Sequence, residues 1–278
     1  MTQLIKFGST TILENVTYLF KLISEPLHPT FFPLPLLPFI HAARLSLGYQ
    51  HLRVKAGGKL SWTADLIGYL VMAWGGSVMV NLILYQPIPQ LVTFRPLLIY
   101  TFTHWSLKLI EFSPSMAFLD RLLPLPDALI RTATITAAVD AVVNHREPAY
   151  AQSLLLQLII GAMAASGGSA LAQSLGTTQP IWRWARPDWM ERPSTIGALD
   201  VWSGVLIAIV YGFLQQTHPT YYLLTTWLNG NFKPLLAPAE ARGACAILLS
   251  IIYYWRAHET HRNLPHRINK VTVGKKKD

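Results

Sequence analysis

Charged side chains are scarce in this chain. Asp, Glu, Lys and Arg make up 13% of its 278 residues, whereas hydrophobic residues make up 51%. A soluble domain contains about 25% charged residues, with which it covers its surface. The apolar residues here also occur in long blocks, and about 20 consecutive ones cross the hydrocarbon core of a bilayer. We therefore expect an all-α membrane protein that is surrounded by the lipid bilayer.

Cysteine and catalytic motifs are also lacking. Cys245 is the only cysteine, so an intramolecular disulfide is excluded. The histidines form no metal-spaced pair in an apolar block, and His258 and His261 lie in the basic tail, where we expect them to be solvated. Neither a Gly-x-x-x-x-Gly-Lys loop nor a Gly-x-Ser-x-Gly elbow occurs. The sequence predicts no enzyme, no metal site and no cofactor.

Acidic residues are fewer than basic ones, which gives a formal net charge of +9. The basic residues lie between the apolar blocks and in the tail, a distribution typical of membrane topology and not of nucleic-acid binding. Fourteen of the Lys and Arg residues fall in alternate loops and beyond residue 254, against five in the other loops and the N-terminal segment. By the positive-inside rule, we expect segment 1–30 in the lumen and tail 256–278 in the cytosol.

Seven apolar blocks are candidates for transmembrane helices. We expect the spans at residues 31–49, 62–85, 91–112, 126–144, 151–175, 196–216 and 237–255. An amphipathic stretch precedes them at residues 12–24. The segment 181–193, rich in Trp, Arg and Pro, is predicted to be an interfacial loop.

Two of these blocks resemble each other. Ala73-Trp74-Gly75-Gly76-Ser77 and Ala165-Ser166-Gly167-Gly168-Ser169 are 92 residues apart, and Asn81 and Gln173 follow at the same offset. The offset covers three spans, an odd number, so the second copy enters the membrane from the opposite side. Many transport proteins contain such inverted repeats. We therefore expect one repeat at 31–112, an inverted one at 126–216 and a final helix at 237–255.

Each copy contains a diglycine, which lowers helix stability by about 1 kcal/mol per glycine relative to alanine. One interpretation is close helix packing, since small residues let backbones approach. The other is that the glycines break or bend the helix, so that its carbonyls border an aqueous path. The symmetry of the two copies favours the second interpretation. We expect the residues that line the pore or form its hinge to be Gly75, Gly76, Ser77, Asn81, Gly167, Gly168, Ser169 and Gln173.

These motifs resemble those of the trimeric intracellular cation channel family. The order and spacing of four short motifs carry the resemblance, namely Phe32-Pro33, Gly75-Gly76, Leu125-Pro126 and Gly167-Gly168. The resemblance implies seven spans, a pore beside the glycines of each protomer, and a homotrimer. It also implies passive flow of potassium or other monovalent cations across the endoplasmic reticulum or a related membrane, which balances charge when calcium leaves the store.

One part of the family pattern is missing. Animal members carry a Lys-Glu-Val signature on the fourth helix, where this chain has Ile135, Thr136 and Ala137. The phosphoinositide anchoring and gating attributed to that signature therefore does not transfer to these residues, although a phosphoinositide lipid stays a candidate partner. The chain resembles a divergent branch of the family.

The fourth span carries Arg131, Thr132 and Asp140, and ionisable groups within a membrane usually face the protein interior. Arg131 and Asp140 are about 13 Å apart along a helix, too far for a local ion pair. We hypothesise that Asp140 attracts cations and that Arg131 gates the path. Alternatively, Arg131 snorkels to the interface or pairs with another span. Other charged residues near span ends are predicted to be interfacial: Arg44, Asp65, Lys108, Asp200 and Arg242.

The last residues are basic. Lys275 and Lys276 occupy the fourth-last and third-last positions, as in cytosolic dilysine retrieval signals of endoplasmic reticulum proteins. The alternative is a basic tail that is solvated or attracted to anionic lipid. The sequon Asn15-Val16-Thr17 is predicted to face the lumen close to the membrane.

Three functions compete. The leading hypothesis is a passive monovalent cation channel. The second is a secondary transporter with a midplane site at the repeat interface. The third is a lipid-modifying enzyme or a membrane scaffold, which requires no conductance.

Overall fold

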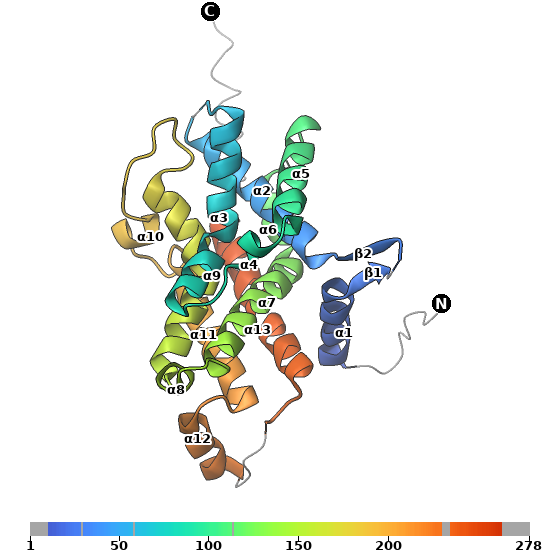
Figure 1. Ribbon diagram of the computed structural model, residues 1–278, viewed down its shortest axis with the longest axis vertical. Helices are drawn as coiled ribbons and strands as arrows, with labels where there is room; N and C mark the ends of the chain where they lie inside the picture. Colours follow the sequence, from blue (N-terminus) through green and yellow to red (C-terminus); the bar gives the residue numbers. More distant parts are fainter. Residues whose placement is uncertain (1–10, 29, 58, 113, 230–233, 263–278) are drawn as a thin grey trace, which may run out of the picture.

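The computed structural model describes residues 11–28, 30–57, 59–112, 114–229 and 234–262. This part of the chain is almost wholly helical (Figure 1). The prediction of an all-α fold is confirmed, with one small addition. Two short strands, β1 (Pro26–His28) and β2 (Phe32–Pro35), pair with each other antiparallel.

Helices occur at every predicted span. The first repeat contains α2 (Leu37–Lys55), α3 (Trp62–Ile83) and α5 (Arg95–Leu109), and the second contains α7 (Pro124–Val143), α9 (Leu154–Leu175) and α11 (Leu199–Gln215). The final helix is α13 (Pro238–His261). The remaining helices are α1 (Ile12–Ser24), α4 (Pro89–Val92), α6 (Met116–Leu122), α8 (Pro148–Ala151), α10 (Asp188–Glu191) and α12 (Pro219–Asn229).

Two helix boundaries differ from the predicted spans, and one helix is additional. The first helix starts at Leu37 and not at residue 31, because Pro33 and Pro35 lack the N–H that a helix interior needs, whereas Pro38 suits a first turn. The last helix continues past residue 255 to His261. Helix α12 was not expected at all.

The repeat is confirmed by the ends of α3 and α9. Both helices have 22 residues, and each end of α9 lies 92 positions after the corresponding end of α3. Ser61 and Ser153, also 92 positions apart, cap the two helices, and each hydroxyl accepts a hydrogen bond from the backbone N–H three residues later. Such caps satisfy one of the free N–H groups of a helix start. The two helices therefore begin by the same local mechanism.

Helices α3 and α9 run antiparallel and pack closely. Gly68, near the start of α3, faces Thr177 beyond the end of α9. Val80 and Leu84, near the end of α3, pack in one cluster with Ile160 near the start of α9. The expected inversion of the second repeat is confirmed by this opposite direction.

The apolar character of the helices differs. Among the described residues, α3 and α9 are long and apolar enough to cross a membrane, and the bent pair α6 and α7, with 75° between them, adds a third span if counted together. Helix α11 is apolar but shorter. The number of seven spans stays a prediction.

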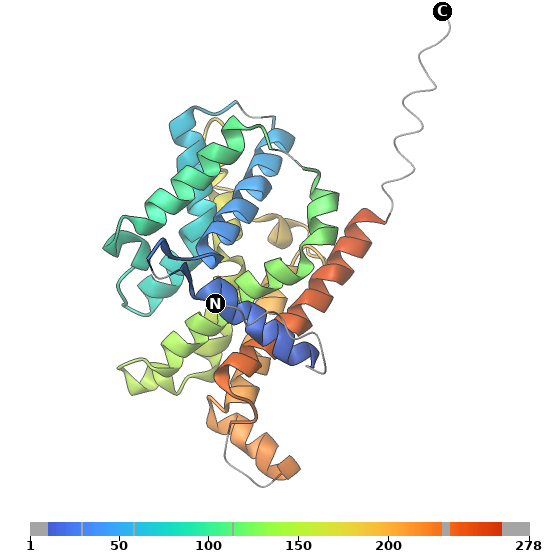
Figure 2. The same cartoon turned by 90° about the vertical axis from the view of Figure 1, so that its right-hand side faces the viewer.

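The final helix, α13, packs mainly against helices of the second repeat. Helix α13 packs against α7 and α11, and its buried Cys245 and Leu249 lie in the same cluster as Ile135 and Ile207. On its other side α1 lies across it (Figure 2), where Gly243 leaves room for Thr17. The ends of α2 and α13 and the start of α3 lie in the upper part of Figure 1, whereas α8 and α12 lie at the bottom.

Candidate functional site

The two diglycines meet where α3 crosses α9. A Cβ atom on Gly167 would lie 2.9 Å from the Cα atom of Gly76, and one on Gly76 would lie 2.9 Å from the carbonyl oxygen of Met163. A Cβ atom on Gly168 would overlap the carbonyl oxygen of Met72. Both helices continue through the glycines without interruption. The expected break is therefore wrong, and the glycines serve close packing of two backbones.

A cavity of about 730 Å³, called the central cavity below, lies beside this crossing. It follows α7 from Asp127 to Ala141, a length of about 21 Å at 1.5 Å per residue. Helices α2, α3 and α9 supply other parts of its wall, so both repeats contribute. Of the predicted pore residues, the central cavity is lined by Gly76, Ser77, Asn81, Arg131, Gly168 and Ser169.

The remaining predicted residues lie elsewhere. Gly75 and Gly167 are buried at the helix crossing, and Thr132 is fully buried within α7. Asp140 accepts hydrogen bonds from Tyr211 and Arg242, each at 2.9 Å, and thereby links α7, α11 and α13. None of these four residues lines the central cavity.

Carboxamide groups line one end of the central cavity. The Asn81 amide donates to the Ser77 carbonyl oxygen at 2.8 Å, and the Gln90 amide donates to the Ser77 hydroxyl at 3.1 Å. The Gln90 carbonyl oxygen is buried without a hydrogen-bond partner in the described structure. Gln90 was not among the predicted pore residues, because it lies outside the repeat motif, in the link that returns the chain to α5.

Three arginines and three aspartates face the central cavity, so their formal charges cancel. Arg44 binds Asp127 at 2.8 Å and Asp120 at 2.7 Å. The Arg256–Asp200 pair is longer, at 3.3 Å. Arg44 and Asp200, both predicted to be interfacial, are thus each paired with a side chain of another helix.

Arg131 is the third arginine. Its guanidinium donates to the carbonyl oxygen of Ala165 on α9, and it forms none of the ion pairs found among the described residues. Through this bond to α9, Arg131 pairs with another span, as one of the two alternative interpretations predicted. Its positive charge therefore stands in the wall of the central cavity.

A second ionic cluster lies within the first repeat, away from the central cavity. Asp65, 1% exposed, binds Lys108 at 2.5 Å and His104 at 3.3 Å, with Arg53 at 3.5 Å. Asp65 and Lys108, also predicted to be interfacial, are thus paired with each other. The position 92 residues after Asp65 is Gln157, whose carbonyl oxygen accepts a neutral hydrogen bond from Thr217 at 2.9 Å. The two repeats thus place a polar link at the same point and use different chemistry for it.

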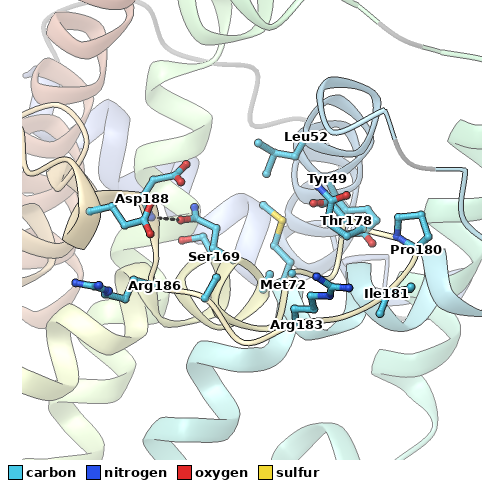
Figure 3. Close-up of a pocket in the computed structure, with 16 residues that line it drawn as sticks. Tyr49, Leu52, Met72, Ser169, Thr178, Pro180, Ile181, Arg183, Arg186 and Asp188 are labelled. Carbon is cyan, nitrogen blue, oxygen red and sulfur yellow. Dashed lines mark hydrogen bonds between the residues drawn. The ribbon is translucent and has the colours of Figure 1, made fainter.

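A cavity of about 640 Å³, called the loop cavity below, lies where the chain leaves α9 (Figure 3). The Tyr49 hydroxyl donates to the Thr177 carbonyl oxygen at 2.8 Å, and the Ala185 N–H donates to Ser174 at 2.8 Å. The Asp188 N–H donates to the Gln173 carboxamide at 3.0 Å, which is the dashed line in Figure 3. These bonds fold the predicted interfacial loop back over the end of α9. Gln173 therefore lines a different cavity from Asn81, its counterpart in the first repeat.

The end of α13 is also more structured than its basic composition suggested. His261 is 8% exposed and lies 3.0 Å from Asp120 of α6. The predicted solvation of His261 is therefore wrong. Lys275 and Lys276 lie outside the described residues.

No group of His, Cys, Asp and Glu side chains suited to holding a metal occurs among the residues described.

The fold is that of a known channel. The structure is similar to that of a trimeric intracellular cation channel from C. elegans in the absence of Ca2+, with a TM-score of 0.56 and 15% sequence identity over 90% of this chain and 95% of that one. The sequence matches no protein-family model and no curated protein. At this identity the similarity concerns the fold, and it confirms the predicted arrangement of two inverted repeats.

Proposed function

We propose that this protein is a passive channel for monovalent cations, chiefly potassium, in an intracellular membrane. The observation that supports the proposal is the central cavity, which follows α7 for about 21 Å between two inverted repeats. Polar side chains and helix backbone at membrane depth are tolerated where they line a cavity. The same fold occurs in a structure described as a cation channel.

The lining chemistry agrees with a cation as the transported species. Ser77, Asn81 and Gln90 place hydroxyl and carboxamide oxygens at one end of the central cavity. Hard monovalent cations are coordinated by such neutral oxygen atoms, which replace part of the hydration shell. The cancelled charges of the arginines and aspartates leave no strong electrostatic trap, so an ion binds weakly enough to leave.

The physiological proposal is counter-ion flow during calcium release. Moving one elementary charge against 100 mV costs about 2.3 kcal/mol. Calcium that leaves a store without compensation would soon build up an opposing potential. A passive potassium path in the same membrane removes that potential.

The proposal also covers the oligomeric state, the membrane and the orientation of the channel. We infer a homotrimer in the endoplasmic reticulum or a related membrane, with segment 1–30 in the lumen and tail 256–278 in the cytosol. Lys275 and Lys276 act as the retrieval signal, and a phosphoinositide is a candidate bound lipid. No residue of the described chain is assigned to that lipid.

Recording from purified protein in planar bilayers tests the proposal. We expect a potassium current whose reversal potential follows the potassium gradient and not the chloride gradient. Ala137→Trp adds bulk on the exposed side of the central cavity and should remove most of the current. Leu155→Trp, at a residue 68% exposed and outside that cavity, is the matched control and should conduct normally. A current carried by chloride, or one that Ala137→Trp leaves intact, contradicts the proposal.

One observation favours a secondary transporter as the second candidate. Opposite charges face each other in a cavity between inverted repeats, where transporters of this type place their substrate sites. Such a protein would carry a saturable flux, and its rate would lie far below that of a channel. The bilayer recordings, combined with isotope uptake into vesicles, distinguish the two.

A further inference from the structure

The central cavity and the loop cavity have a common wall. Three residues line both, namely Leu52 on α2, Met72 on α3 and Ser169 on α9. The loop cavity continues toward Gln173, Arg183 and Asp188, and the central cavity continues toward Ser77 and Asn81. The two cavities therefore adjoin at one level of the helix bundle.

Met72 is the largest flexible side chain at this junction. Its carbonyl oxygen is held against Gly168 in the helix crossing, so its backbone position is rigid. Its side chain reaches α2, where the terminal methyl carbon lies 3.9 Å from the site that a Cβ atom would occupy on Gly48. In Figure 3 the sulfur end of Met72 points toward Leu52. The side chain thus extends across the junction from α3 to α2.

Two of the three residues at the junction, Leu52 and Met72, are apolar, and the hydroxyl of the third, Ser169, donates to the Ser166 carbonyl oxygen at 2.9 Å. Both sides of the junction are more polar. Arg183 and Asp188 lie in the loop cavity, and Arg44 and Arg131 lie in the central cavity. A hydrophobic constriction between two hydrated compartments stops ions by excluding water. Methionine has an unbranched, flexible side chain and can leave such a position by rotation. These properties are those of a gate.

The gate belongs to one repeat only. The position 92 residues after Met72 is Ala164, which lines the central cavity and extends no side chain beyond its methyl group. The symmetry of the two repeats therefore does not require a large residue at this point. The larger Met72 side chain narrows the cavity on the α3 side, whereas the small Ala164 does not narrow it on the α9 side.

Resting on the proposed channel function, we propose that Met72, closing against Leu52, is the gate between the loop cavity and the central cavity. Ions pass from the loop after α9, across the Met72 junction, into the central cavity. The loop cavity is thus the vestibule of the path on the side of the basic loops, and the Met72 side chain determines whether water connects the two cavities.

Single-channel recording of Met72 variants tests the gate. Met72→Ala should raise the ratio of open to closed states roughly tenfold, which corresponds to a shift of about 1.4 kcal/mol in that equilibrium. Met72→Leu keeps an apolar side chain of similar volume and should behave like the wild type. Met72→Gln keeps the length but binds water, and it should also open the path. Met79→Ala is the matched control, because Met79 is on the same helix and lines neither cavity.

A chemical readout supplements the currents. In Met72→Cys, a charged thiol reagent added on the side of the C-terminal tail should reach the new thiol and change the current, since the native Cys245 is buried. A Met72→Cys thiol that reacts from neither side overturns the gate. Wild-type conductance in Met72→Ala and Met72→Gln also overturns it and leaves the channel proposal standing. A folded wild-type protein without current overturns both.

Discussion

The glycines at the helix crossing have a steric role that differs from residue to residue. A Cβ atom on Gly168 would overlap the backbone of Met72, whereas one on Gly48 would make ordinary contacts at 3.9 Å and 4.0 Å. Overlap with a neighbouring backbone is relieved only when two helices separate. Packing against α3 therefore requires glycine at position 168, although this residue also lines the central cavity.

Gly168→Ala should destabilise the protein by about 1–3 kcal/mol, the usual cost of overpacking a close contact. Gly48→Ala should be neutral or stabilise α2 by about 0.5–1 kcal/mol, because alanine favours the helix. Thermal unfolding in detergent measures both variants. Equal melting temperatures for the two would show that the α3–α9 contact tolerates a methyl group at Gly168.

Arg131 is the residue whose charge should matter most for an ion in the central cavity. It donates to a backbone carbonyl and forms none of the ion pairs found in the described part of the chain, so its positive charge repels a passing cation. Arg131→Gln should raise the potassium conductance, and Arg131→Lys should keep it near the wild-type value. The ratio of the two single-channel conductances measures the effect of the charge. A lower conductance in Arg131→Gln would contradict repulsion as the role of Arg131.

At the scale of the elements, an ionic cluster joins the three helices of the first repeat, whereas the corresponding position of the second repeat makes a neutral hydrogen bond. Asp65 connects α3 to α5 through Lys108 and His104 and to α2 through Arg53. The corresponding place in the second repeat contains the neutral Gln157. Removal of one member of a buried ionic cluster leaves the others without compensation.

Asp65→Ala should therefore destabilise the protein by about 3–5 kcal/mol, the range for breaking a buried pair. The control is Glu25→Ala, which removes the exposed Lys21–Glu25 pair and should change stability by less than about 1 kcal/mol. Unfolding followed by circular dichroism measures both changes. Similar stabilities for the two variants would refute a structural role for the Asp65 cluster.

At the scale of the whole molecule, the basic loops mark one face. The loop after α9 contains Arg183, Arg186 and Arg192, and the link between α2 and α3 lies in the same part of Figure 1 as the end of α13. The positive-inside rule assigns such a face to the cytosol. The loop cavity would then open toward the cytosol.

Protease protection in intact microsomes tests this orientation. A tag after Asp278 should be digested, and a tag before Met1 should be protected until detergent is added. Lys275→Ala combined with Lys276→Ala should move the protein to later compartments of the secretory route, as seen by fluorescence microscopy. A protected C-terminal tag would invert the topology and remove the basis for a retrieval signal.

The sequence by itself determined the repeat, its offset and its inversion. These follow from local properties: the apolar blocks and the diglycine motifs recur 92 residues apart, and finding them needs no knowledge of which helices touch. Only the tertiary structure decided that the diglycines pack face to face, that Asp140 binds Arg242, and that Gln90 and Met72 lie at cavities. Those facts depend on which helix faces meet, and spacing along the chain carries no information about partners some ninety to a hundred residues away.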